Sequence, residues 1–148
     1  MARMRTQGEE ESRTALADVL MHAMPANALH EIFAASAGDA ASASGFALML
    51  AAMLDKGMLD RDIPDRESRA LFLIREYRRG SGRYYPPGLA ELGIDPARCF
   101  SVDAPDTLSA LKATADIARS GAAGAVVLEL VGKPRLLDLT ARRRLALA

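Results

Sequence analysis

Four short segments of strand-like, mainly apolar composition, which we call runs, alternate with stretches of helical periodicity along the chain. The runs occupy residues 29–33, 70–74, 99–102 and 125–130. The helical stretches lie at residues 14–24, 45–54 and 106–121, just before Gly93, and from Thr140 onward. Strands that alternate with helices need crossover connections, and these produce parallel pairing. The sequence therefore predicts an α/β fold, with a mostly parallel sheet and flanking helices.

The connection between the first apolar run and the next helix is typical of a phosphate-binding loop. Residues 34–44 are small, Asp39 lies among them, and Gly45 is expected to open the helix. A working P-loop needs a lysine for the β and γ phosphates, but no lysine lies between Phe33 and Leu54. Asp39 also places a negative charge where a phosphate would sit, and like charges repel at short range. We therefore expect a degenerate P-loop, no nucleotide cofactor and no ATPase activity.

The composition excludes several kinds of site. The 148 residues suffice for one domain, and 19 acidic residues balance 19 basic ones, so bulk charge favours no particular partner. The single cysteine, Cys99, excludes an internal disulfide and a cysteine-cluster zinc site, and we expect no metal. No apolar stretch reaches the ~20 residues of a membrane span, and no signal peptide is evident, so we expect a cytoplasmic protein. The polar residues 1–13 are expected to be flexible, ahead of a domain at 14–148.

Glu129 follows four apolar residues, 125–128, of the last run, at the position where Walker-type ATPases hold an acid for magnesium. It either orders a metal-bound water or is a strand-end charge that reaches solvent. Without a P-loop lysine a metal-binding acid has no phosphate to serve, so we favour the second interpretation and expect no catalytic residue. Cys99 and His30 are both interpreted as structural.

The loop after the second run is the best candidate for a functional surface. It holds four arginines and all three tyrosines of the chain: Arg75, Arg78, Arg79, Arg83, Tyr77, Tyr84 and Tyr85. Arginine with aromatic side chains is the chemistry of phosphate contact and base stacking, and also of protein-binding hot spots. The loop is therefore either a recognition surface or merely solvated.

Several tracts in the same order resemble the ImuA family of RecA-like proteins. The tracts are residues 29–33, 45–48, 82–96, 125–130 and 138–145, within a resemblance that covers 25–148. ImuA proteins belong to the bacterial damage-inducible mutagenesis cassette and work in translesion synthesis. The resemblance implies a RecA-type recombinase, an ImuB-like protein and an error-prone polymerase as partners, with single-stranded DNA as a further candidate.

Residues 118–122, which lead into the acidic strand, are similar to the same region of the RecA recombinase. By that resemblance Glu129 matches the Walker B acid, as a vestige, whereas Tyr77 falls at the catalytic glutamate and Ala40 near the P-loop lysine. The resemblance implies a non-catalytic interaction protein in SOS-type DNA damage tolerance. A nucleotide-dependent ATPase, in which the loop backbone cradles phosphate, and a damage-induced cell-division inhibitor remain alternatives. RecA-like domains continue beyond the acidic strand, so we expect the domain to be incomplete at Ala148.

Overall fold

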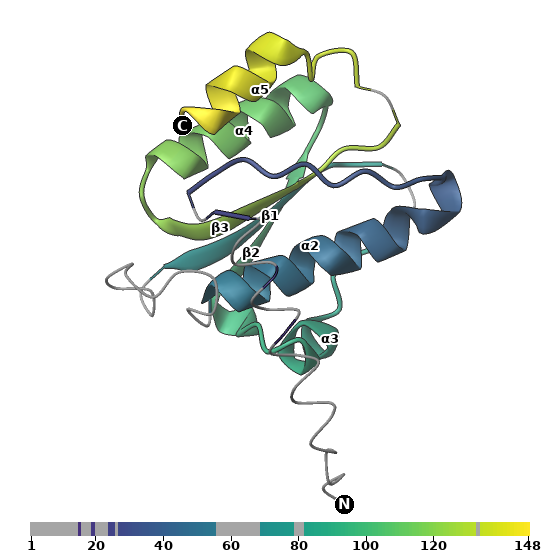
Figure 1. Ribbon diagram of the computed structural model, residues 1–148, viewed down its shortest axis with the longest axis vertical. Coiled ribbons are helices and arrows are strands. Elements are labelled where there is room, and N and C mark those ends of the chain that lie inside the picture. Colours follow the sequence, from purple (N-terminus) through teal and green to yellow (C-terminus); the bar gives the residue numbers. More distant parts are fainter. Residues whose placement is uncertain are drawn as a thin grey trace, which may run out of the picture.

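In the part of the chain that the structure describes, three parallel strands form a sheet with helices on both faces. The computed structural model describes Ala15, Val19, Met24, Pro25 and residues 27–55, 69–78, 82–132 and 134–148. Its elements are η1 (Ala37–Asp39), α2 (Ala40–Asp55), β1 (Ala70–Glu76), α3 (Pro86–Glu91), η3 (Pro96–Arg98), β2 (Cys99–Ala104), α4 (Thr107–Arg119), β3 (Ala123–Glu129) and α5 (Leu139–Ala146). β1 is parallel to both neighbours in the order β2-β1-β3. α2 covers one face and α4 the other, with α5 beside α4 (Figure 1). The predicted α/β class with a parallel sheet is confirmed at this level.

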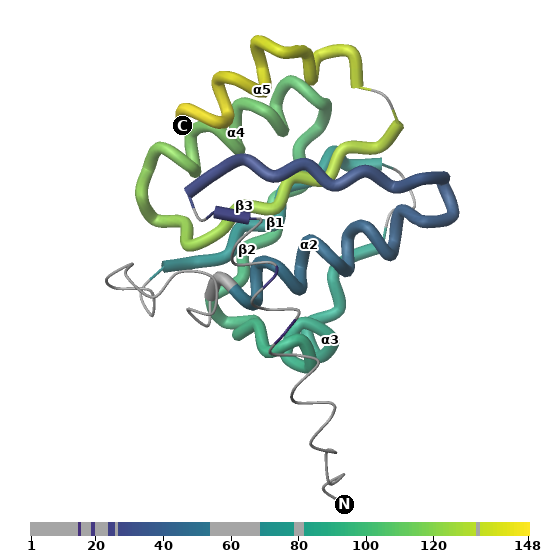
Figure 2. The backbone as a smooth tube through the Cα atoms, in the orientation of Figure 1, coloured from purple at the N-terminus to yellow at the C-terminus, as the bar shows by residue number. Residues whose placement is uncertain are grey.

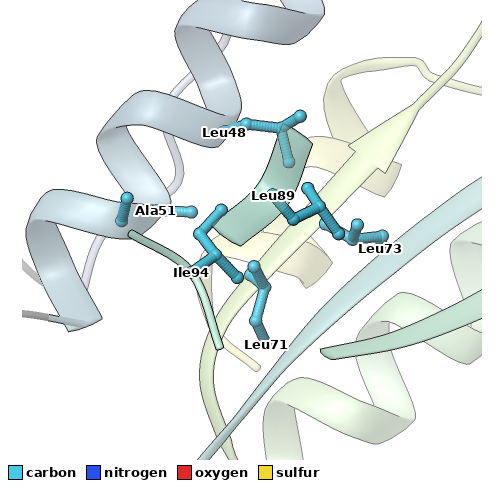
Figure 3. Close-up of a cluster of buried hydrophobic side chains, with 7 residues drawn as sticks. Leu48, Ala51, Leu71, Leu73, Leu89 and Ile94 are labelled. Carbon is cyan, nitrogen blue, oxygen red and sulfur yellow. The ribbon is translucent and has the colours of Figure 1, made fainter. Parts of the chain in front are cut away.

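β1 forms the buried centre of the sheet, as its unbroken apolar run predicted. Alternate side chains of a strand point to opposite faces, so Leu73 and Ile74, both fully buried, serve two separate clusters. On the α4 side, Ile74 packs with Ala104 and Ala110. The α2 side holds Leu48, Ala51, Ala52, Leu71, Leu73, Leu89 and Ile94 (Figure 3).

Local signals determine both ends of α4. Asp106 Oδ1 accepts a hydrogen bond from the backbone N–H of Ser109 at 2.7 Å, which satisfies a group that the first turn leaves without a partner. After the last turn Gly121 has φ +72°, a left-handed conformation that residues with a Cβ rarely adopt. Asp106 and Gly121 are the cap and stop that the sequence predicts, and both are confirmed.

Residues 29–33 do not form the predicted strand. The segment is exposed, with Phe33 at 74 % exposure, and its residues pair with none of β1, β2 and β3. It leads towards α2 in Figure 2, and Arg142 Nε from α5 donates to Glu31 Oε1 at 2.7 Å. A short run of this composition indicates a preference for extended backbone, but a strand also needs a neighbouring strand with which to exchange hydrogen bonds. Among the described residues, β3 pairs with β1 alone.

The loop before α2 is shorter than predicted, because α2 begins at Ala40 rather than at Gly45. Residues 40–44 are alanine and serine, which do not interrupt a helix once it has formed. The turn η1 precedes α2, and Ser36 Oγ donates to Asp39 Oδ2 at 2.8 Å. The Asp39 carboxylate therefore accepts a hydrogen bond from the Ser36 hydroxyl at the start of the helix.

Two predictions fall mainly outside the described residues. Of the helix predicted at 14–24, Ala15, Val19 and Met24 are described, the first two as helix and Met24 as a bend, and the segment 1–13 is not described. The predicted terminal helix is α5. Among the residues that the structure places, no helix has both the length and the apolar character to cross a bilayer.

Candidate functional site

A row of three charged side chains crosses the carboxyl ends of the strands. Arg75 of β1 is in register with Asp103 of β2 on one side and with Glu129 of β3 on the other. Arg75 follows Leu73 by two residues, so its side chain lies on the α2 side of the sheet. Parallel strands end at the same edge, which is why three residues distant in sequence meet there.

Arg75 is the centre of this row. Its Nε lies 2.5 Å from Asp103 Oδ1, and its NH1 donates to the backbone oxygen of Gly82. The guanidinium carbon lies 5.6 Å from the centroid of the Tyr84 ring, within the range of a cation–π contact. Only 11 % of the Arg75 side chain is exposed. The hydrogen bond from Arg75 lowers the pKa of Asp103, and the same bond raises the pKa of Arg75, so each charge stabilises the other.

Tyr84 and Glu129 form the second, less satisfied half of the cluster. The Tyr84 hydroxyl and Glu129 Oε1 are both buried, and neither makes a hydrogen bond of good geometry among the described residues. Burial raises the pKa of Tyr84, and Glu129 raises it further, both through its charge and as a hydrogen-bond acceptor close to the hydroxyl. The hydroxyl is therefore protonated at neutral pH. An unsatisfied buried polar group costs about 1–3 kcal/mol, so this pair is a weak point of the fold.

The seven predicted surface residues divide into two groups, because the structure turns some of them inward. Arg75 and Tyr84 belong to the interior cluster. The other described candidates are exposed, and we call them the outward surface: Tyr77, Arg78, Arg83 and Tyr85. Tyr77 is 55 % and Tyr85 70 % exposed. Arg78 NH2 lies 3.7 Å from Glu76 Oε1 and 3.4 Å from the backbone oxygen of Val131. Arg79, the remaining candidate, lies outside the described residues.

Glu129 is partly exposed at the end of β3, and one of its two carboxylate oxygens, Oε1, is buried. Its neighbour in the row is the cation of Arg75 rather than another acid. Within the described part of the chain, no group of three or more His, Cys, Asp or Glu side chains could hold a metal ion. The role of the residue as a vestigial Walker B acid stays a prediction.

Comparison with protein-family models, with curated proteins and with solved structures found no match. The RecA-like and ImuA-like interpretation is therefore carried by the tracts of the sequence. The parallel sheet is compatible with it at a coarse level.

Sequence reasoning missed two members of the cluster, Asp103 and Gly82. A signal for Asp103 was present, because it is the polar residue that follows the apolar run 99–102, as Glu129 follows its own run. Gly82 contributes only its backbone oxygen, and side-chain patterns give no indication of such a contact.

Proposed function

We propose that this protein is a non-catalytic RecA-like accessory protein, which binds other proteins during SOS-type DNA damage tolerance and error-prone translesion synthesis. The ImuA-like tracts support the cellular role, and the missing lysine supports the absence of ATPase activity. The outward surface is the observation that carries the interaction role, because tyrosine and arginine dominate binding energy at protein interfaces. A cytoplasmic location belongs to the same proposal.

The charges around the outward surface favour a protein partner over single-stranded DNA. Arg78 lies near Glu76, so a carboxylate offsets one arginine of the outward surface, and the covered Arg75 beside it is paired with Asp103. A surface that follows a phosphate backbone needs an excess of positive charge, which releases counterions on binding. The candidate proteins are a RecA-type recombinase, an ImuB-like protein and an error-prone polymerase.

The test compares two double variants in binding to each candidate. Arg83→Ala with Tyr85→Ala removes the centre of the outward surface, whereas Arg119→Ala with Leu139→Ala removes one arginine and one exposed apolar side chain from α4 and α5. We expect the first variant to raise the Kd for at least one of the three proteins by about tenfold or more, and the second to leave it unchanged. Binding is measured by biolayer interferometry, and binding to a labelled single-stranded oligonucleotide by fluorescence anisotropy.

The results separate the possible functions. Loss of oligonucleotide binding without loss of protein binding would replace the protein partner by single-stranded DNA. If the wild type binds none of the four probes, or if the first variant binds them all as the wild type does, the proposed function is wrong.

One observation favours the competing function of a nucleotide-dependent ATPase. The unpartnered Glu129 Oε1 lies at the carboxyl end of β3, where such enzymes hold magnesium. Two observations stand against an ATPase: the Arg75 cation is in register beside Glu129, and the Asp39 carboxylate accepts a hydrogen bond from Ser36 at the start of α2. Titration of the protein with ATP and magnesium in a calorimeter should give no saturable heat up to millimolar ligand. A micromolar Kd would establish the competing function instead.

A further inference from the structure

The connection between β1 and α3 is fastened near both of its ends. The backbone N–H of Tyr77 donates to the oxygen of Ala104 at 2.7 Å, next to the end of β2. At the other end, Arg75 NH1 donates to the oxygen of Gly82, seven residues further along the chain. A side chain of β1 thus closes the base of the loop that carries the outward surface.

Arg75 holds the base of the loop through several atoms of its side chain. Nε contacts Asp103 of β2 while NH1 reaches Gly82, and the guanidinium lies over the Tyr84 ring. A planar guanidinium can bond two acceptors at fixed angles, which a lysine ammonium on a flexible stem cannot reproduce. The closure therefore depends on an arginine at this position and not only on a positive charge.

The residues on either side of Arg83 are the ones that Arg75 holds. Gly82 is fixed through its backbone oxygen, and Tyr84 through its ring and its burial. Arg83, between them, is exposed, and so is Tyr85, which precedes the first proline of α3. With both neighbours fixed, few backbone conformations remain for Arg83.

We propose that Arg75 is a positioning residue, which holds Gly82 and Tyr84 against the sheet and so presents Arg83 and Tyr85 to a protein partner. This inference rests on the proposed function of the outward surface. Arg75 is almost entirely covered and makes no contact with the partner. Its effect is pre-organisation, since a loop that is already ordered loses less conformational entropy when it binds.

Limited trypsin digestion tests the positioning without any partner. Trypsin cleaves after arginine, and the Arg83–Tyr84 bond can enter the protease only when Tyr84 leaves its contacts. Arg75→Lys keeps the charge beside Asp103 but loses the bond to Gly82, and we expect cleavage at this bond, followed by mass spectrometry, to accelerate by about tenfold or more. Arg119→Lys, at an exposed pair with Asp116 on α4, is the matched control and should leave the rate unchanged.

The second measurement is the affinity of Arg75→Lys for whichever protein binds the wild type in the experiment above. We expect its Kd to rise by about tenfold, the cost of ordering a few loop residues on binding. Unchanged cleavage in the folded Arg75→Lys variant would overturn the inference, and so would faster cleavage with unchanged affinity. Failure of the proposed function is distinguishable, because it is measured with the Arg83→Ala and Tyr85→Ala variant, in which Arg75 is intact.

Discussion

Tyr84→Phe gives a sharp test of the interior cluster, because the sign of its effect depends on whether the hydroxyl has a partner. The substitution keeps the ring, and with it the packing and the contact of the guanidinium of Arg75. It removes a buried hydroxyl that makes no hydrogen bond of good geometry within the described structure, although the Glu129 carboxylate lies close to it. Since such a group costs about 1–3 kcal/mol, we expect the free energy of unfolding to rise by about 1 kcal/mol.

The measurement is urea denaturation followed by circular dichroism, with a thermal scan beside it. A gain of about 1 kcal/mol corresponds to a Tm increase of roughly 3–5 °C for a domain of this size. Tyr85→Phe is the control. The hydroxyl of Tyr85 is on an exposed side chain, so its removal should change the free energy of unfolding by less than about 0.5 kcal/mol.

A loss of stability in Tyr84→Phe would refute this reasoning, since it would mean that the hydroxyl donates a hydrogen bond in solution. A double-mutant cycle with Glu129→Gln would then identify the acceptor. A coupling free energy near zero would exclude Glu129.

Three further predictions follow from individual residues. Leu73→Ala should lower the free energy of unfolding by about 2–5 kcal/mol, because the side chain is fully buried, whereas exposed Leu147→Ala should change it by less than about 0.5 kcal/mol in the same urea titration. Gly121→Ala should cost about 1 kcal/mol or more, and this cost comes from the backbone alone, since a Cβ there would meet no atom within 4 Å. Because Arg75 lowers the pKa of folded Asp103, the stabilisation is complete above the ordinary aspartate pKa and is lost as the pH falls through the lowered value. Asp103→Asn should therefore be less stable than the wild type at pH 6, and the difference, measured by thermal scans, should shrink below about pH 4.

The parts of the fold that the sequence predicts correctly are those determined by local physics. β1 follows from five consecutive apolar residues, and both ends of α4 follow from Asp106 and Gly121. Each of these signals acts through a residue and its immediate neighbours in the chain, so no knowledge of the tertiary arrangement is needed.

The errors arise where the outcome depends on a distant partner. Residues 29–33 have the composition of a strand, but strand formation depends on a neighbour that the run itself does not specify. The start of α2 is a different case: small residues resemble a phosphate-binding loop, but alanine, three of the five residues at 40–44, is the strongest helix former.

The candidate site could be predicted only in part for the same reason. The sequence identified the loop, yet it could not indicate that Arg75 and Tyr84 turn inward, because Asp103 lies 28 residues away from Arg75 in the chain. Register between parallel strands brings them together, and a single sequence contains no record of register.

The ion pair between Glu31 and Arg142 has a consequence for the order in which the chain folds. It joins residues 111 positions apart, so it can form only after the sheet and α5 have assembled. Both side chains are about one-third exposed, and a pair in such surroundings contributes about 1 kcal/mol at most. We therefore expect residues 29–36, which pair with none of the described strands, to dock late during folding and to detach early. Their amide hydrogens exchange with solvent through this local opening, whereas those of β1 exchange only when the whole domain unfolds.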